Sequence, residues 1–251
     1  MNNHLVEIKN VSAHYGKKQV LTGVSFNVEE RDFLGIIGPN GGGKTTLVKI
    51  LLGLVKPSEG TVTFFHEGKP SSRPRIGYLP QYLSFDHKFP VTVTDVVLSG
   101  LLGQRNLFRR FTEDEHKQAH QIISQLELQE FAQAPISQLS GGQRQRVLLG
   151  RTLICQPKLI ILDEPSTYID HQHQSELYAI LNEINRQCAI ILVSHDIGTV
   201  LQNVSNIVCV NGHAHFHPVS EVTEDIMENS FGCPFQLVAH GELPHRVLEA
   251  H

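Results

Sequence analysis

A glycine-rich loop is the clearest place for chemistry in the sequence. Residues 38–45 read Gly-Pro-Asn-Gly-Gly-Gly-Lys-Thr after an apolar run, which is the G-x-x-x-x-G-K-[ST] pattern in a strand–loop–helix context. Glycines let the backbone N–H groups converge on a phosphate, and the following helix directs its positive end at the same point. We expect Lys44 to pair with the β- and γ-phosphates, Thr45 to offer its hydroxyl to Mg²⁺ and Thr46 to add a donor. The predicted nucleotide-binding residues are Gly38, Pro39, Asn40, Gly41, Gly42, Gly43, Lys44, Thr45 and Thr46.

Two acids end a second apolar run. Residues 159–162 are Leu-Ile-Ile-Leu and precede Asp163 and Glu164. Such a run predicts a buried strand whose carboxyl end delivers the acids to the edge where α/β sheets bind ligands. We expect Asp163 to hold Mg²⁺ through water and Glu164 to polarise the attacking water. Solvated acids at an ordinary strand end are the alternative, and the phosphate loop in the same chain favours the hydrolytic pair.

A second anion-binding helix start lies at residues 139–143, Leu-Ser-Gly-Gly-Gln, which begin 24 residues before Asp163. Ser140 can cap the helix expected near Gln143, and Gly141 and Gly142 leave backbone N–H groups open. One nucleotide does not need two such sites from one subunit. A head-to-tail dimer gives the second site a role, because each subunit then closes this loop over its partner's nucleotide.

With this pentapeptide, the sequence strongly resembles the ATP-binding cassette (ABC) ATPases over about residues 5–212. The resemblance implies an α/β P-loop NTPase fold with an antiparallel β subdomain and an inserted helical subdomain at about 83–145. It implies an ATPase domain at 1–212 followed by a His-rich tail at 213–251. The cofactors implied are ATP and Mg²⁺, and the working form implied is a homodimer of nucleotide-binding subunits.

Four further positions match this family. Gln81 is similar to the loop glutamine that links the catalytic Mg²⁺ to the helical subdomain, and His195 to the switch histidine that contacts the γ-phosphate. Asp170 is similar to the loop aspartate that crosses the dimer, and Tyr15 is placed to stack on adenine. The resemblance therefore assigns catalytic roles to Lys44, Gln81, Glu164 and His195, nucleotide contacts to Tyr15, Ser140, Gly141, Gly142, Gln143 and Asp170, and Mg²⁺ contacts to Thr45, Gln81 and Asp163.

The chain departs from the family in the loop before Asp170. Tyr168 stands where a small residue is usual, and Ile169 stands where Leu is usual. A large ring there could alter dimer packing or nucleotide release. The departure removes no catalytic group, so the expected activity remains ATP hydrolysis.

Hydrophobic periodicity predicts the elements that position these residues. Short strands alternate apolar and polar residues with period two, and longer apolar runs are typical of strands buried on both faces of a sheet. Strands are expected at 5–8, 24–28, 33–37, 61–65, 75–80, 159–162 and 189–193, and helices at 44–52, 94 to about 131 with a start at Thr112, 143–153 and 174–185. This alternation indicates a parallel α/β sheet.

Composition excludes several classes of protein. The chain has 251 residues, 40% of them hydrophobic, and a net charge of −4, which suits a globular protein and opposes a DNA-coating role, so no nucleic-acid partner is expected. No apolar stretch is long enough for a membrane helix, and the first residues do not resemble a signal peptide. Four widely spaced cysteines suggest a reduced compartment and mostly buried thiols.

The cassette resemblance and the absence of a membrane span together predict separate permease subunits, so that the chain sits peripherally at the cytoplasmic face of the cell membrane. The helical region at about 83–145 is where the family contacts such partners, and the segment 101–111 mixes apolar and basic residues that suit docking. A merely solvated helical lobe is the alternative. An extracytoplasmic metal-binding protein is expected as an indirect partner.

The substrate class rests on the loop sequence and on the tail. The loop and the short length resemble the zinc, manganese and iron importer branch, and the residues around 233–248 resemble tails of that branch. Alternating histidines on an extended strand share one face and can bind Zn²⁺, while a polar strand and frayed tail are the alternative. The alternating residues are His213, His215 and His217, and the tail adds Cys233, His240, His245 and His251.

Other functions stay open at this point. An importer ATPase for a different substrate and a soluble cassette ATPase of iron–sulfur cluster assembly share the same motifs. A DNA-repair cassette would carry long coiled coils between the nucleotide motifs, and Asp163 follows Lys44 by only 119 positions. The sequence therefore favours the ATPase subunit of a transition-metal importer, with zinc first.

Overall fold

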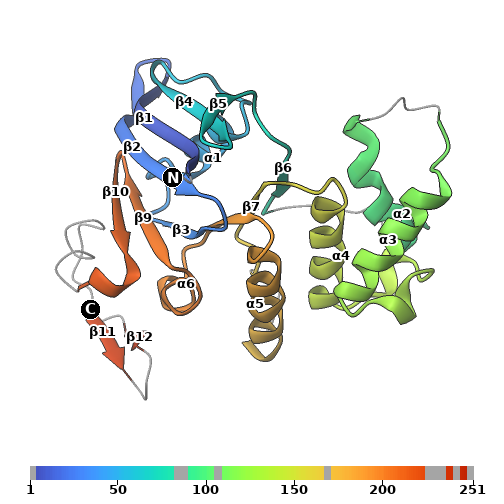
Figure 1. The fold of residues 1–251 in the computed structure, drawn as a ribbon. Helices are drawn as coiled ribbons and strands as arrows, with labels where there is room; N and C mark the ends of the chain where they lie inside the picture. Colours follow the sequence, from blue (N-terminus) through green and yellow to red (C-terminus); the bar gives the residue numbers. More distant parts are fainter. Residues whose placement is uncertain are drawn as a thin grey trace. The chain divides into compact units, whose positions relative to one another are not determined.

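The protein forms two compact units in the computed structural model (Figure 1). The first unit combines residues 1–74 with 188–251, and the second is residues 75–187. The structure describes residues 4–81, 90–104, 109–166, 171–223, 236–239 and 244–247. Of the residues singled out from the sequence, Tyr168, Ile169, Asp170, Cys233, His240 and His251 lie outside that description, as does the side chain of His245.

The first unit begins with an antiparallel sheet. Its strands are β1 (His4–Tyr15), β2 (Lys18–Glu29), β4 (Glu59–His66) and β5 (Lys69–Ser71), in the order β2-β1-β4-β5. Val6 pairs with Val28 and Ile8 with Phe26 across β1 and β2, and these four side chains are buried. The short strands predicted at 5–8 and 24–28 are therefore the apolar centres of longer strands.

A second set of strands in the first unit contains the predicted apolar runs. β3 (Phe33–Ile37) lies between β8 (Ala189–Val193) and β9 (Asn206–Asn211), parallel to both, and β10 (His213–Pro218) is antiparallel to β9. Every residue of β3 and β8 is buried, as expected of strands covered on both faces. The unit also contains α1 (Lys44–Leu51), α6 (Ile197–Asn203), η4 (Val219–Glu221), β11 (Gln236–Ala239) and β12 (Pro244–Val247).

The second unit joins a strand pair to a group of helices. β6 (Ile76–Leu79) is parallel to β7 (Leu159–Asp163). The helices are α2 (Val93–Leu98), α3 (Glu113–Gln125), α4 (Gly141–Leu153) and α5 (His171–Asn185), with 3₁₀ turns η1 (Ser99–Gln104), η2 (Gln129–Phe131) and η3 (Ile136–Gln138). α2 packs against both α3 and α4, and the three helices bury Val97, Ile123 and Val147.

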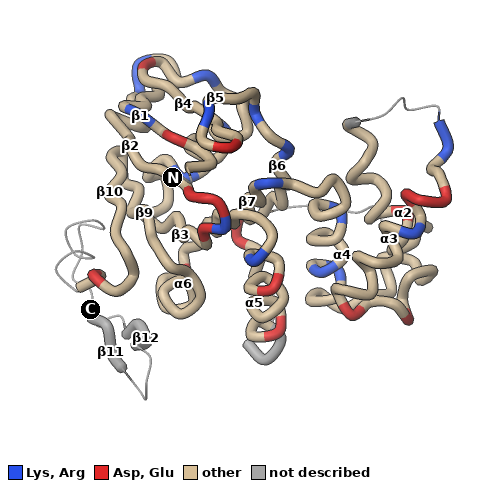
Figure 2. Tube along the Cα trace, viewed as in Figure 1, with Lys and Arg blue, Asp and Glu red and all other residues tan. Residues whose placement is uncertain are grey.

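Side-chain caps fix where the helices of the second unit begin. Thr112 caps α3 as predicted, since its hydroxyl accepts a hydrogen bond from the Glu115 N–H and its own N–H donates to the Glu115 carboxylate at 2.6 Å. The first turn of α3 carries three acids, which suits the positive end of a helix dipole (Figure 2). Thr92 caps α2 in the same way with Asp95. Separate caps thus divide the stretch predicted as helical from 94 to 131 into several elements.

The arrangement confirms the expected fold class. An antiparallel sheet, parallel strands with helices between them, and a helical region inserted between β6 and β7 in the chain are all present. Cys155, Cys188 and Cys209 are buried thiols, as predicted. Among the described residues, no helix has both the length and the apolar character needed to cross a membrane.

Candidate functional site

The phosphate loop of the first unit depends on glycine for its shape. It leaves the buried strand β3 at Gly38, and Gly38, Gly41 and Gly43 all have positive φ, at 152°, 78° and 108°. A Cβ on Gly38 would lie 2.0 Å from the backbone oxygen of Val210, and one on Gly43 would lie 2.5 Å from Leu21 Cδ2. Side chains are therefore excluded at Gly38 and Gly43, and the positive φ angles give the curled backbone that binds a phosphate.

Lys44 is folded over the same loop. Its side chain is only 8% exposed, and its Nζ donates to the carbonyl oxygens of Gly38 at 2.8 Å and Pro39 at 3.0 Å. These bonds hold a full positive charge against the first two residues of the loop. α1 begins at Lys44 with Gly43 as its N-cap residue, so no N-cap side chain covers the positive end of this helix. The loop therefore fits a polyphosphate.

The carboxyl ends of β3 and β8 lie at one edge of the first unit. The strands are parallel, Ile36 pairs with Val193, and the Ser194 N–H donates to the Ile36 carbonyl at 3.2 Å. His195 follows directly and is exposed. The structure thus brings the predicted His195 and the phosphate loop to the same edge of the parallel strands, where α/β sheets bind ligands.

Tyr15 ends β1, and its ring is 51% exposed. An exposed ring at the end of a strand is accessible to a base, as the predicted stacking role needs. Thr45 is exposed on the first turn of α1, whereas Thr46 is buried. The exposure of Thr45 is compatible with a hydroxyl that faces a cation, and the burial of Thr46 is compatible with a hydroxyl that supports the loop.

The predicted acids end the parallel strand pair of the second unit. Asp163 is the last residue of β7 and is 8% exposed. Glu164 follows with a positive φ of 53°, which turns the chain sharply away from the strand. Gln81 comes two residues after β6, the strand parallel to β7, and is half-buried. Asp163, Glu164 and Gln81 are therefore delivered at one edge of this unit.

A contact that sequence reasoning missed lies at this edge. The hydroxyl of Tyr78 on β6 donates to Asp163 Oδ2 at 3.4 Å. Burial raises the pKa of Tyr78, and the charge of Asp163 and this hydrogen bond raise it further. The phenol is thus kept as a donor. Its only signal in the sequence is a polar ring in an otherwise apolar strand three residues before Gln81.

The first unit has a similar contact that was not predicted. Gly212, in the turn between β9 and β10, donates its N–H to the Gly42 carbonyl at 2.9 Å and accepts a hydrogen bond from Thr22 N at 2.7 Å. Through Gly212, the phosphate loop is linked to the turn between β9 and β10 and to Thr22 on β2. No side-chain pattern reports such a contact.

The Leu-Ser-Gly-Gly-Gln segment forms the start of α4, as predicted. Ser140 Oγ accepts from the Gln143 N–H at 3.3 Å, and the Ser140 N–H donates to Gln143 Oε1 at 2.9 Å. The first turn of the helix carries no acid, and Gly141 and Gly142 are only partly covered. This helix start can therefore accept an anion.

The oxygen donors suit magnesium better than zinc. In the second unit Asp163 offers a carboxylate and Gln81 an amide oxygen, and in the first unit Thr45 offers a hydroxyl; oxygen donors of these kinds are the ligands that Mg²⁺ prefers. His213, His215 and His217 alternate along β10. Among the described residues, however, no three or more His, Cys, Asp or Glu side chains lie close enough together to hold a metal ion. The three β10 histidines by themselves do not form the zinc site considered from the sequence.

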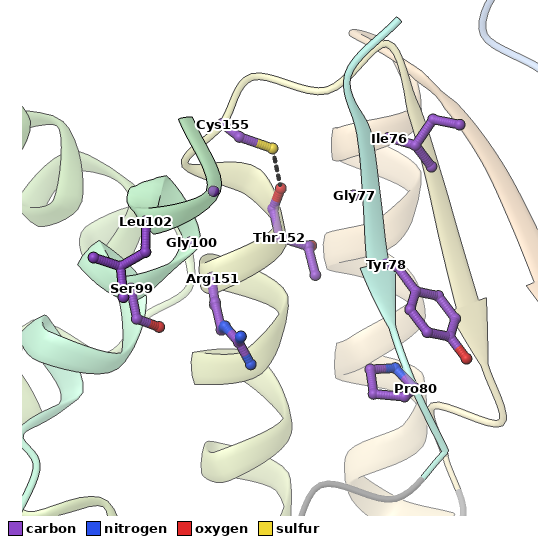
Figure 3. Close-up of a pocket in the computed structure, with 11 residues that line it drawn as sticks. Ile76, Gly77, Tyr78, Pro80, Ser99, Gly100, Leu102, Arg151, Thr152 and Cys155 are labelled. Carbon is purple, nitrogen blue, oxygen red and sulfur yellow. Dashed lines mark hydrogen bonds between the residues drawn. The ribbon is translucent and has the colours of Figure 1, made fainter. Parts of the chain in front are cut away.

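A cavity of about 540 Å³ opens in the second unit between β6, η1 and α4 (Figure 3). Its walls include Gly77, Leu102, Arg151 and Cys155. The Cys155 thiol donates to the Thr152 carbonyl at 3.2 Å, and burial raises its pKa, so the thiol stays protonated.

Comparison with known proteins supplies a relationship for the whole chain. A model of the ABC transporter family matches residues 21–167. The zinc import ATP-binding protein ZnuC of Hydrogenovibrio crunogenus is 37% identical over 246 residues, which cover 96% of this chain and 93% of that protein.

Two solved structures support the same relationship. An ABC transporter assigned to the metal-chelate type, in an inward-facing conformation, superimposes with a TM-score of 0.86 at 26% identity and covers 98% of this chain and 97% of its own. A dimeric ATP-binding cassette in a post-hydrolysis state with ADP and phosphate has a TM-score of 0.68 at 27% identity, covering 86% and 99%.

Proposed function

Because this chain belongs to the ABC transporter family as an ATP-binding subunit, we propose that it hydrolyses ATP to drive import of a divalent transition metal, with zinc first and manganese or iron next. One observation carries the choice of cargo. The likeness to a protein named for zinc import extends over 96% of the chain, including the tail beyond the family match. ATP hydrolysis is the activity of the family, and the curled loop under Lys44 fits its nucleotide.

We assign the binding of ATP to the phosphate loop and Tyr15. The loop N–H groups and the Lys44 ammonium hold the phosphates, and Tyr15 stacks on adenine. Thr45, Gln81 and Asp163 are the oxygen donors that would hold Mg²⁺, which supplies positive charge to the phosphate oxygens when it is bound.

The hydrolytic step belongs to Glu164 and His195. Glu164 orients the attacking water and takes its proton, and His195 contacts the γ-phosphate that leaves. In a head-to-tail homodimer, Asp170 and the residues Ser140, Gly141, Gly142 and Gln143 would act on the partner's nucleotide. The partly exposed Gly141 and Gly142 in the first turn of α4, which carries no acid, support this assignment.

The second unit is the proposed contact with a membrane permease. Leu102 in η1 is 39% exposed beside the cavity, and Arg109 and Arg110 are exposed farther along the segment 101–111. Exposed apolar and basic groups within one segment suit contact with a loop of a membrane protein. On this proposal the chain binds the cytoplasmic face of the membrane, and an extracytoplasmic metal-binding protein delivers cargo to the permease.

The domain limits are part of the proposal. We retain an ATPase domain at 1–212 with a helical subdomain at about 83–145 and a His-rich tail at 213–251. β10 begins at His213 and pairs with β9 over its whole length. A truncation intended to test the tail should therefore begin after η4 rather than at residue 213.

Co-purification and ATPase measurements test the transporter assignment. Expressed with a candidate permease subunit, the full chain is expected to purify from membranes together with that subunit. Reconstituted in vesicles, it should hydrolyse ATP faster when a zinc-loaded extracytoplasmic receptor is added. Purification with soluble cluster-assembly proteins, or stimulation only by a different solute, would overturn the proposal in favour of the corresponding alternative.

A further inference from the structure

Strands β6 and β7 place a phenol next to the buried acid. Tyr78 pairs with Ile161 in the parallel register, and Asp163 lies two residues farther along β7 on the same face. The Tyr78 hydroxyl reaches Asp163 Oδ2 at 3.4 Å. Tyr78 is one of the residues that line the cavity, and in Figure 3 its ring points away from Arg151 and Leu102.

Because Asp163 is buried, the hydrogen bond from Tyr78 influences how its carboxylate is oriented. Asp163 is 8% exposed, and a buried carboxylate is held in the rotation that satisfies its hydrogen-bond partners. A donor on Oδ2 therefore helps to set the plane of the carboxylate and the direction of its other lone pairs. Groups that orient a metal ligand in this way commonly change metal affinity when they are removed.

We propose that Tyr78 is a positioning residue whose hydroxyl holds the Asp163 carboxylate in the orientation in which it holds Mg²⁺. This inference rests on the role given to Asp163 in the proposed function. It assigns to Tyr78 no contact with the nucleotide and no part in proton transfer. The phenol acts through Asp163, so its loss should weaken the response to Mg²⁺ and leave metal-free nucleotide binding intact.

Tyr78→Phe is the variant that isolates the hydroxyl, because it keeps the ring that packs on β6. The matched control is Tyr178→Phe, which removes a phenol hydroxyl from a buried ring on α5 of the same unit. The full-length protein is used throughout. Mn²⁺ serves as the spectroscopic probe, and its binding in the presence of ATP is followed by electron paramagnetic resonance.

Tyr78→Phe is expected to weaken Mn²⁺ binding and to raise the Mg²⁺ concentration for half-maximal ATPase activity by about tenfold, the lower end of the effect of losing an orienting partner. The affinity for ATP with a chelator present should stay within about twofold of the wild type, since ordinary hydrogen bonds elsewhere are unchanged. Tyr178→Phe should leave the metal response unchanged. An equal loss of ATP affinity with and without metal would overturn the inference, because it would indicate a general structural effect.

Asp163→Asn separates failure of the inference from failure of the proposed function. If Asp163→Asn loses the response to Mn²⁺ and Tyr78→Phe keeps it, only the role of Tyr78 is wrong. If Asp163→Asn binds Mn²⁺ as the wild type does, the metal role of Asp163 and the inference both fail. Adding Tyr78→Phe to Asp163→Asn should have no further effect on metal binding, and an independent effect would also contradict the inference.

Discussion

The phosphate loop and the acidic strand end are built in different ways. In the first unit, the loop is shaped by main-chain groups close in sequence: three glycines with positive φ, and carbonyls of Gly38 and Pro39 that hold Lys44. In the second unit, Asp163 meets a side chain from a strand 85 residues away in sequence. The phosphate loop therefore depends on backbone shape, whereas the acidic strand end depends on paired side chains.

Glu164→Gln should give the largest effect of the variants, a loss of ATP turnover, and it tests the role of the side chains at the acidic strand end. The amide keeps the shape of the carboxylate but cannot take a proton, so turnover should fall by about 10³-fold while ATP binding is retained. ATP should then trap a dimer, measured by size-exclusion chromatography beside a steady-state ATPase assay. Unchanged hydrolysis would remove Glu164 from its role, and Glu130→Gln, an exposed acid in η2, is the control.

Lys44→Ala should have the next largest effect, on binding rather than turnover. It removes the charge that the loop carbonyls hold in place, and the affinity for ATP should fall by roughly 100-fold, since bonds to charged groups are among the strong ones. Calorimetric titration with ATP measures this loss of affinity. Lys49→Ala changes an exposed lysine on the same helix and should bind normally. Normal ATP binding by Lys44→Ala would contradict the phosphate-loop assignment.

Two glycines of the loop test whether backbone shape is the controlling feature. Gly38→Ala places a Cβ against the Val210 carbonyl, whereas Gly41→Ala finds nothing within 4 Å and bears only the strain of positive φ. We expect Gly38→Ala to lower the free energy of unfolding by about 3 kcal/mol and Gly41→Ala by about 1 kcal/mol. Urea unfolding compares the two. A larger loss for Gly41→Ala would mean that the packing of Gly38 on Val210 does not limit the loop.

Arg146 should give the smallest effect, because its partners are exposed. Its Nη1 contacts Glu127 at 3.0 Å and its Nη2 contacts Glu176 at 2.5 Å, and these acids are 72% and 48% exposed. Arg146→Ala should lower the free energy of unfolding by about 1 kcal/mol. Lys117→Ala, which removes a fully surface pair with Asp114, should change it by less than about 0.5 kcal/mol. Equal losses would show that the bridging position of Arg146 adds nothing.

The same contrast explains what sequence could predict. The loop at 38–45, the buried strand at 33–37 and the caps at Thr112 and Ser140 are local patterns, and the structure has each of them where the residues indicated. β1 is longer than predicted because the register shift between Ile8 and Val11 breaks the period-two pattern. Local propensity does not anticipate such irregularities.

The contacts of Tyr78 and Gly212 could not be predicted for a different reason. Each joins segments far apart in the chain, and the strand pairing that brings them together is settled by the fold. Tyr78 in an apolar strand resembles a core residue until β7 is paired with β6. Gly212 forms its contacts through the backbone alone. A glycine at this position indicates a turn, but it does not indicate which segment the turn contacts.

Uptake of radioactive ⁶⁵Zn²⁺ tests the central claim most directly. Bacteria that lack their own zinc importer would express the chain with a candidate permease and a candidate zinc receptor, as wild type or as Glu164→Gln. The account predicts that the wild type accumulates ⁶⁵Zn²⁺, that unlabelled Zn²⁺ competes better than Mn²⁺ or Fe²⁺, and that Glu164→Gln with intact expression accumulates none above background. Equal uptake with the wild type and Glu164→Gln, or uptake that unlabelled transition metals do not reduce, would contradict it.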